Sequence, residues 1–127
     1  MKIWLLLSLA ATLAACAPQT GTSFPNVSVT DLKAAVDAGA YVLDVRTPAE
    51  YAEGHIAGAA LLPLDEVAAR ADAVPGDRPV YVICRSGNRS AQASELLVKA
   101  GKDVRNVAGG MNDWVAAGYP VKTGTQP

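Results

Sequence analysis

The sequence predicts an α/β fold in which a parallel sheet carries helices on both faces. Short apolar segments alternate with segments of helical periodicity between residues 24 and 121, a pattern typical of covered parallel sheets. Glycine- and proline-rich turns separate these segments. The 127 residues leave room for one domain, and a hydrophobic content of 50% is enough for a packed core.

The first elements are marked by local signals. Residues 24–27 are expected to form a short strand. Ser28 is placed to begin a helix with Leu32 on its apolar face, and Gly39 ends that helix. Residues 41–45 then form an apolar strand.

A capping box predicts the next helix. Thr47 takes the N-cap position, Pro48 the first helical position, and Glu50 reaches back to the cap. Gly54 stops this short helix, and residues 59–62 form a third strand.

The remaining elements follow the same alternation. Asp65 is expected to start a helix over residues 66–73, and a turn leads to the apolar strand 80–83. A helix over 90–100 comes next. Residues 104–107 are expected to form the last strand and, after a tight turn at Gly109-Gly110, residues 111–116 the last helix.

Cys84 opens a loop between a buried strand and a helix. The loop runs Cys84-Arg85-Ser86-Gly87-Asn88-Arg89 and leads into Ser90. A strand, tight loop and helix direct backbone N–H groups and the positive helix end at the loop's first side chain. This environment favours a thiolate with an anion beside it, so Cys84 is the candidate nucleophile.

Other chemistries find little support. His55 is the only histidine and the only further soft ligand near Cys84, so no zinc site is expected. His55 lies in a turn, where a structural hydrogen-bonding role is expected rather than that of a general base. The net charge of -1 gives no general reason to expect nucleic acid as a partner.

The N-terminus predicts export and lipidation. Lys2 precedes an apolar stretch too short to span a bilayer comfortably, which ends Leu13-Ala14-Ala15-Cys16 and resembles a bacterial lipobox. Residues 1–15 are then a signal peptide and 16–23 a lipidated Cys16 with a flexible tether. An ordinary signal peptide or an uncleaved anchor are the alternatives. Ala17 after the cysteine favours, by resemblance to lipoprotein sorting, the outer membrane of a Gram-negative cell.

Three motifs resemble the signatures of the rhodanese domain. They are residues 43–59 (from Leu43-Asp44-Val45-Arg46 to Gly58-Ala59), the loop 84–90, and Gly109-Gly110-Met111-Asn112-Asp113-Trp114 followed by 118–121. The resemblance implies a five-stranded parallel sheet over residues 24–121 and a sulfurtransferase whose cysteine carries a persulfide. The tail 122–127 is expected to be disordered.

The resemblance also implies roles for the loop. Cys84 is the expected catalytic residue, and the backbone from Arg85 to Ser90 is the expected cradle of the persulfide. Arg85 and Arg89 are expected to hold an anionic donor such as thiosulfate, with cyanide or a thiol as acceptor and no cofactor. The residues expected to bind substrate are Arg85, Ser86, Gly87, Asn88, Arg89 and Ser90.

Other signature residues have structural interpretations. Arg46 is expected to form an ion pair with Glu50 across the strand–helix turn, and Trp114 to pack the last helix on the core. Asp44 and His55 are also expected to be structural.

Two alternatives remain open. The cell-cycle dual-specificity phosphatases share this fold, but they place five residues between cysteine and arginine, whereas Arg89 follows Cys84 after four. A shorter loop suits a single sulfur atom better than a phosphate. The second alternative is a sulfur-carrier or binding module that acts only with a dedicated protein partner.

Overall fold

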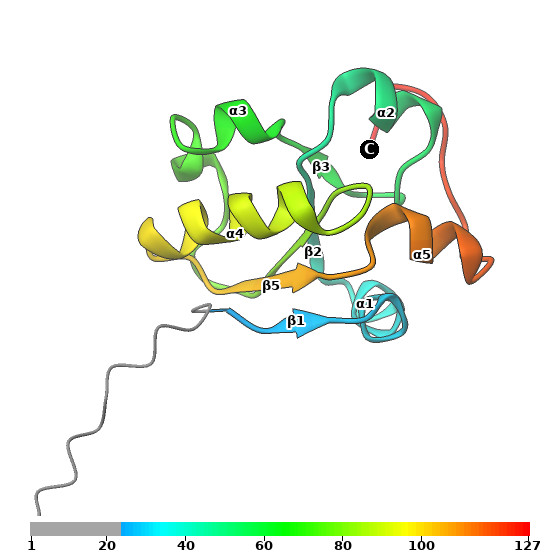
Figure 1. Cartoon of the computed structure of the whole chain (residues 1–127), viewed down its shortest axis with the longest axis horizontal. Helices are drawn as coiled ribbons and strands as arrows, with labels where there is room; N and C mark the ends of the chain where they lie inside the picture. The colour runs from blue at the N-terminus through cyan, green and yellow to red at the C-terminus, as the bar shows by residue number, and fades with distance from the viewer. Residues whose placement is uncertain (1–23) are drawn as a thin grey trace, which may run out of the picture.

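A five-stranded parallel sheet forms the centre of the molecule, in the order β1-β5-β4-β2-β3 (Figure 1). This computed structural model describes residues 24–127, so the predicted signal peptide, Cys16 and the tether lie outside the described residues. The strands are β1 (Asn26–Val27), β2 (Tyr41–Asp44), β3 (Ala60–Leu61), β4 (Val80–Ile83) and β5 (Val104–Val107). The predicted fold class is confirmed.

Four α-helices connect these strands and a fifth follows the last one. They are α1 (Val29–Asp37), α2 (Pro48–Glu53), α3 (Leu64–Val67), α4 (Asn88–Lys99) and α5 (Gly110–Ala116), with a 3₁₀ turn, η1 (Ala71–Ala73), after α3. The capping box of α2 is present as predicted: the Glu50 amide donates to the Thr47 hydroxyl, and the Thr47 amide donates to the Glu50 carboxylate.

The predicted helix over residues 66–73 is wrong. The chain becomes helical already at Leu64, whose amide donates to the Val45 carbonyl at 3.1 Å. Pro63 is therefore the N-cap in place of the expected Asp65. The helix α3 ends at Val67, and only the 3₁₀ turn η1 follows it over Ala71–Ala73.

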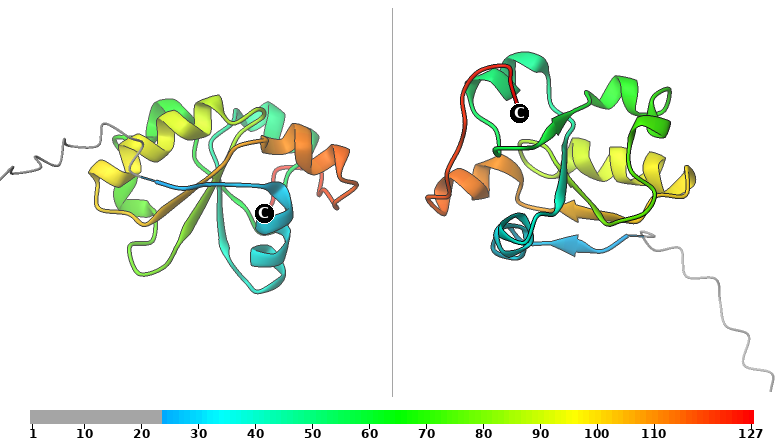
Figure 2. Two further views of the ribbon diagram at one scale, coloured as in Figure 1. Left: turned by 60° about the horizontal axis from the view of Figure 1, so that its bottom comes forward. Right: turned by 180° about the vertical axis from the view of Figure 1, so that it is seen from behind.

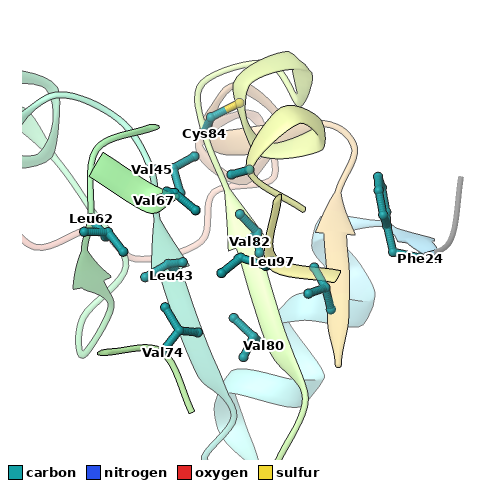
Figure 3. Close-up of a cluster of buried hydrophobic side chains, with 12 residues drawn as sticks. Phe24, Leu43, Val45, Leu62, Val67, Val74, Val80, Val82, Cys84 and Leu97 are labelled. Carbon is teal, nitrogen blue, oxygen red and sulfur yellow. The ribbon is translucent and has the colours of Figure 1, made fainter. Parts of the chain in front are cut away.

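The alternation of side chains along β4 divides the core into two layers. Val80, Val82 and Cys84 lie in the cluster under α3 and α4, while Ile83 lies in the cluster with Trp114 on the side of α1 and α5. Figure 2 shows α1 on the opposite side of the sheet from α3 and α4. Figure 3 shows Cys84 beyond Val80 and Val82, at the end of the strand.

The expected disorder of the tail 122–127 is also wrong. Lys122 and His55 exchange two main-chain hydrogen bonds of 2.8 and 2.9 Å, and the Gly124 amide donates to the Ala52 carbonyl. The tail therefore runs beside α2 and ends there (Figure 1). Within residues 24–127, no helix combines the length and the apolar character needed to cross a bilayer.

Candidate active site

Cys84 occupies the carboxyl end of the central strand. It follows β4, which pairs with β2 on one side and β5 on the other, and its side chain is completely buried. Within the described part of the chain it has no disulfide partner. The sheet thus delivers one free thiol to the edge where ligands bind in open parallel sheets.

Hydrogen-bond donors surround the sulfur of Cys84. The Gly87 amide donates to Sγ at 3.1 Å, and the Ser90 hydroxyl lies 3.4 Å from it. Burial raises the pKa of the Cys84 thiol, but hydrogen bonds with the Ser90 hydroxyl and with the amides of Ser90, Ser86 and Gly87 outweigh this, so the pKa lies below its ordinary value. The site favours the thiolate, which is the nucleophilic form.

The loop needs a glycine where it turns into α4. Gly87 has φ 99°, in the left-handed region, and it is the N-cap of α4. That conformation aims its amide at the sulfur while the helix begins at Asn88, two residues before the predicted start. The first turn of α4 then brings Ser90 under the thiol.

The start of α5 fixes the other side of the loop. The amides of Met111 and Asn112 donate to the carbonyls of Cys84 and Arg85, at 2.8 and 3.0 Å. A Cβ atom on Gly110 would lie 2.6 Å from the Cys84 oxygen, so only glycine allows this approach. Gly109-Gly110 follows β5 and Cys84 follows β4, so a parallel sheet is expected to place both segments at the same edge, and these hydrogen bonds confirm that expectation.

The loop side chains divide into exposed and paired groups. Arg85, Ser86 and Asn88 are exposed, and the Arg85 side chain makes no hydrogen bond or ion pair within residues 24–127. A hollow of about 330 Å³ lies beside it; Arg46, Glu50, Arg85, Met111, Val115 and Val121 are among the residues that line it. Arg85 is therefore placed to meet an anion entering from solvent.

Arg89 does not match the expectation of an arginine free for an anionic donor. Its guanidinium donates to both oxygens of Glu50, at 2.7 and 2.8 Å. These bonds, against the opposing effect of partial burial, lower the pKa of Glu50 to about 2. The two terminal nitrogens of the Arg89 guanidinium are therefore already bound to a carboxylate of the protein.

The predicted ion pair between Arg46 and Glu50 is wrong. Arg46 instead binds the buried Asp44, with its Nη2 2.7 Å from one carboxylate oxygen. Arg46 also donates to the main-chain carbonyls of Glu50 and Gly54, at 3.3 and 2.8 Å. Its guanidinium is thus turned toward the carbonyls of α2, which leaves the Glu50 side chain to Arg89.

His55 and Trp114 have the structural roles expected of them. The His55 ring stacks on Tyr51 at 3.6 Å, and its two nitrogens lie 2.7 and 2.8 Å from the carbonyl oxygens of Tyr51 and Gln126. The buried Trp114 donates from its indole nitrogen to the Pro120 carbonyl. Neither residue has a polar contact with the Cys84 sulfur.

Glu50 is the residue of this site that sequence reasoning missed. The capping box accounted fully for a glutamate at that position, and its second partner lies 39 residues away in sequence. Only the convergence of β2 and β4 at one sheet edge could have suggested the contact.

The fold and the site together define a domain that presents one activated thiolate at the end of a central parallel strand. Residues 28–117 match the rhodanese-like domain. The chain belongs to the rhodanese-like family.

Named relatives agree with this assignment. The chain is 39% identical over 99 residues to YrkF of Bacillus subtilis, a candidate sulfur carrier protein, covering 76% of this chain and 54% of YrkF. It is 42% identical over 86 residues to the thiosulfate sulfurtransferase GlpE of Pseudomonas putida, covering 67% of this chain and 77% of GlpE. The chain thus spans about half the length of YrkF, and sulfur transfer of the rhodanese type is the general chemistry that these relatives support.

A solved structure shows the same fold. The rhodanese-related protein of Thermoplasma volcanium superposes with a TM-score of 0.74 at 36% identity, covering 78% of this chain and 98% of that chain. The five-stranded sheet and its helices are therefore those of a rhodanese-like domain.

Proposed function

We propose that this protein moves a sulfane sulfur from a donor such as thiosulfate to cyanide or a thiol, through a persulfide on Cys84. The observation that carries the proposal is the buried thiol of Cys84, which accepts a hydrogen bond from the Gly87 amide and lies beside the Ser90 hydroxyl. The similarity to a thiosulfate sulfurtransferase supports thiosulfate as the first donor to test.

The proposed reaction has two balanced steps. The Cys84 thiolate attacks the outer sulfur of thiosulfate, a sulfur–sulfur bond forms to Cys84, and sulfite leaves with the electron pair of the broken bond. Cyanide then attacks the outer sulfur of the persulfide, thiocyanate leaves, and the thiolate of Cys84 is regenerated. No proton or external electron is consumed in either step.

The loop supplies what each step needs. Backbone amides from Arg85 to Ser90 hold the persulfide anion in place of the thiolate, as fixed dipoles that need little reorganisation. The exposed guanidinium of Arg85 attracts the anionic donor to the hollow beside the loop.

Intact-mass measurement of the purified protein tests the proposal. After incubation with thiosulfate, we expect a gain of one sulfur atom, which peptide mapping assigns to Cys84. Cyanide should remove the sulfur and release thiocyanate. Cys84→Ser should show neither change while remaining folded, and sulfur transfer by that variant would refute the proposal.

A sulfur-carrier role is the second candidate, favoured by the 39% identity to YrkF. A carrier would accept sulfur on Cys84 from a protein donor and show no turnover with thiosulfate and cyanide. If Cys84 accepts sulfur from a protein that carries a cysteine persulfide but not from thiosulfate, the result would favour the carrier. Steady turnover of thiosulfate and cyanide would favour the enzyme.

We further propose that the protein is exported and anchored by a lipid on Cys16, on the periplasmic face of the outer membrane. The apolar stretch before Leu13-Ala14-Ala15-Cys16 supports this proposal. Expression in a Gram-negative host with labelled palmitate tests it: label should enter the chain and be absent from Cys16→Ser. Unlabelled wild-type protein would contradict the lipid anchor.

A further inference from the structure

Glu50 and Arg89 form a two-pronged ion pair at the edge of the thiol site. The carboxylate comes from α2 and the guanidinium from the first turn of α4, and their side chains are 23% and 33% exposed. The hydrogen bonds to Glu50 raise the pKa of Arg89, to which the nearby charges of Glu50, Cys84 and Asp44 also contribute. Arg89 directly precedes Ser90, whose hydroxyl lies 3.4 Å from the Cys84 sulfur, so the guanidinium belongs to the turn that holds the sulfur the donor must approach.

An anionic donor meets two obstacles at this position. The edge of the Arg89 guanidinium formed by Nη1 and Nη2 donates to both oxygens of Glu50, so an incoming oxyanion cannot use that bidentate edge while the pair is intact. Glu50 also carries a negative charge on the wall of the hollow through which Arg85 is exposed. Both effects grow with the charge of the donor.

We infer that Glu50 is a specificity-determining residue: by occupying Arg89 it weakens the binding of doubly charged donors relative to donors of lower charge. This inference rests on the proposed function and deepens it. A dianion gains the bidentate contact with Nη1 and Nη2 of Arg89 only when it displaces Glu50, whereas a donor of lower charge loses less by leaving that ion pair intact.

Two donors that carry the same kind of sulfane sulfur but different net charges test this inference. Thiosulfate carries two negative charges and releases sulfite, while methanethiosulfonate carries one and releases methanesulfinate when the Cys84 thiolate takes its outer sulfur. For Glu50→Gln, we expect the KM for thiosulfate to fall about fivefold, the size of one partly exposed charge interaction. The KM for methanethiosulfonate should fall about twofold or less, with kcat nearly unchanged for both.

Matched variants separate this effect from a merely structural one. Glu95→Gln makes the same charge change on an exposed position of α4, without an ion pair in the described structure, and should leave both KM values unchanged. Thr47→Ala removes the hydrogen bonds between the Thr47 hydroxyl and Glu50 but keeps the charge of Glu50. It should lower the Tm and leave the ratio of the two KM values unchanged.

The outcomes decide between the inference and the function on which it rests. Equal KM ratios in wild type and Glu50→Gln would overturn the inference while sulfur transfer itself stands. Failure of both donors to load wild-type Cys84 would instead overturn the proposed function. If Glu50→Gln does not fold, Glu50→Asp shortens the carboxylate by one methylene and should shift the KM ratio in the same direction by a smaller factor; no shift would count against the inference.

Discussion

Gly87 lies so close to Ala108 that a Cβ atom at position 87 would stand 2.1 Å from the Ala108 carbonyl oxygen. This contact brings the loop after β4 against the segment after β5. It occurs at the same residue whose amide donates to the Cys84 sulfur. The packing of two loops and the activation of the thiol therefore depend on one missing side chain.

Gly87→Ala is expected to destabilise the fold and disturb the site together. A left-handed backbone costs alanine about 1–2 kcal/mol, and the collision with Ala108 adds to it, for a total loss of about 3 kcal/mol. Urea unfolding measures this loss. Gly39→Ala is the matched control, since Gly39 has φ 88° but open space around its Cβ position, and about 1 kcal/mol is expected there. Equal losses at the two positions would mean that the contact is unimportant.

Ser90→Ala should raise the pKa of Cys84. The Ser90 hydroxyl is one of the groups that lower the pKa of Cys84, and a hydrogen bond to a charged group is worth about 1.5 kcal/mol, or about one pH unit. The pH profile of thiol alkylation measures the shift. Ser94→Ala is the control. The Ser94 hydroxyl lies one turn further along α4 and donates to the Ser90 carbonyl, not to the sulfur. The pH profile of thiol alkylation in Ser94→Ala should therefore be the same as in wild type.

Arg85→Gln should raise the KM for thiosulfate about fivefold, because one exposed cation near the thiol is lost. Steady-state kinetics at low salt measure the effect, which should shrink as salt screens the charge. Arg78→Gln removes the same charge before β4, where Arg78 lies over the Tyr41 ring at the other end of the strand. An equal rise in that variant would point to net charge and not to position.

The ion pair of Glu50 predicts a loss of stability in acid. The pKa of Glu50 in the folded protein is about 2, below its ordinary value of 4.5. The stabilisation is therefore complete above about pH 4.5 and disappears as the pH falls towards 2. We expect about 1 kcal/mol from this partly exposed pair. Urea titrations across this window should show a shallower pH dependence for Glu50→Gln than for wild type, and parallel curves would contradict the assignment.

Asp44→Asn should be the costlier change at the sheet edge. Asp44 is fully buried, and its loss leaves the buried guanidinium of Arg46 uncompensated, at about 3–5 kcal/mol. Asp37→Asn breaks the exposed pair with Lys33 and should cost about 0.5 kcal/mol or less. Thermal unfolding of the two variants provides the comparison. A small effect of Asp44→Asn would mean that water reaches Arg46.

The sequence predicted the features that depend on neighbouring residues. The strand over residues 80–83 matches β4, and the cap formed by Thr47 and Glu50 is present as expected. Hydrophobic periodicity and capping act within one or two turns of the chain, so they can be recognised without knowledge of the fold.

The features that it missed depend on contacts between distant segments. Arg89 takes Glu50 away from Arg46, and the tail is held by His55 and Ala52. In each case several partners were chemically acceptable, and the partner actually used comes from a segment distant in sequence. Local chemistry sets the possible partners, but only the assembled sheet decides among them.

The main-chain hydrogen bonds from α5 to the carbonyls of Cys84 and Arg85 hold the loop backbone independently of the loop's side chains. They set the path of the loop backbone, whereas the side chains at positions 85, 86 and 88 point to solvent and take no part in holding that path. Substitutions at these three positions can therefore change which donors bind without altering the environment of the Cys84 sulfur. The loop is a fixed reactive centre with an exchangeable outer surface, a suitable starting point for evolving or engineering new donor preferences.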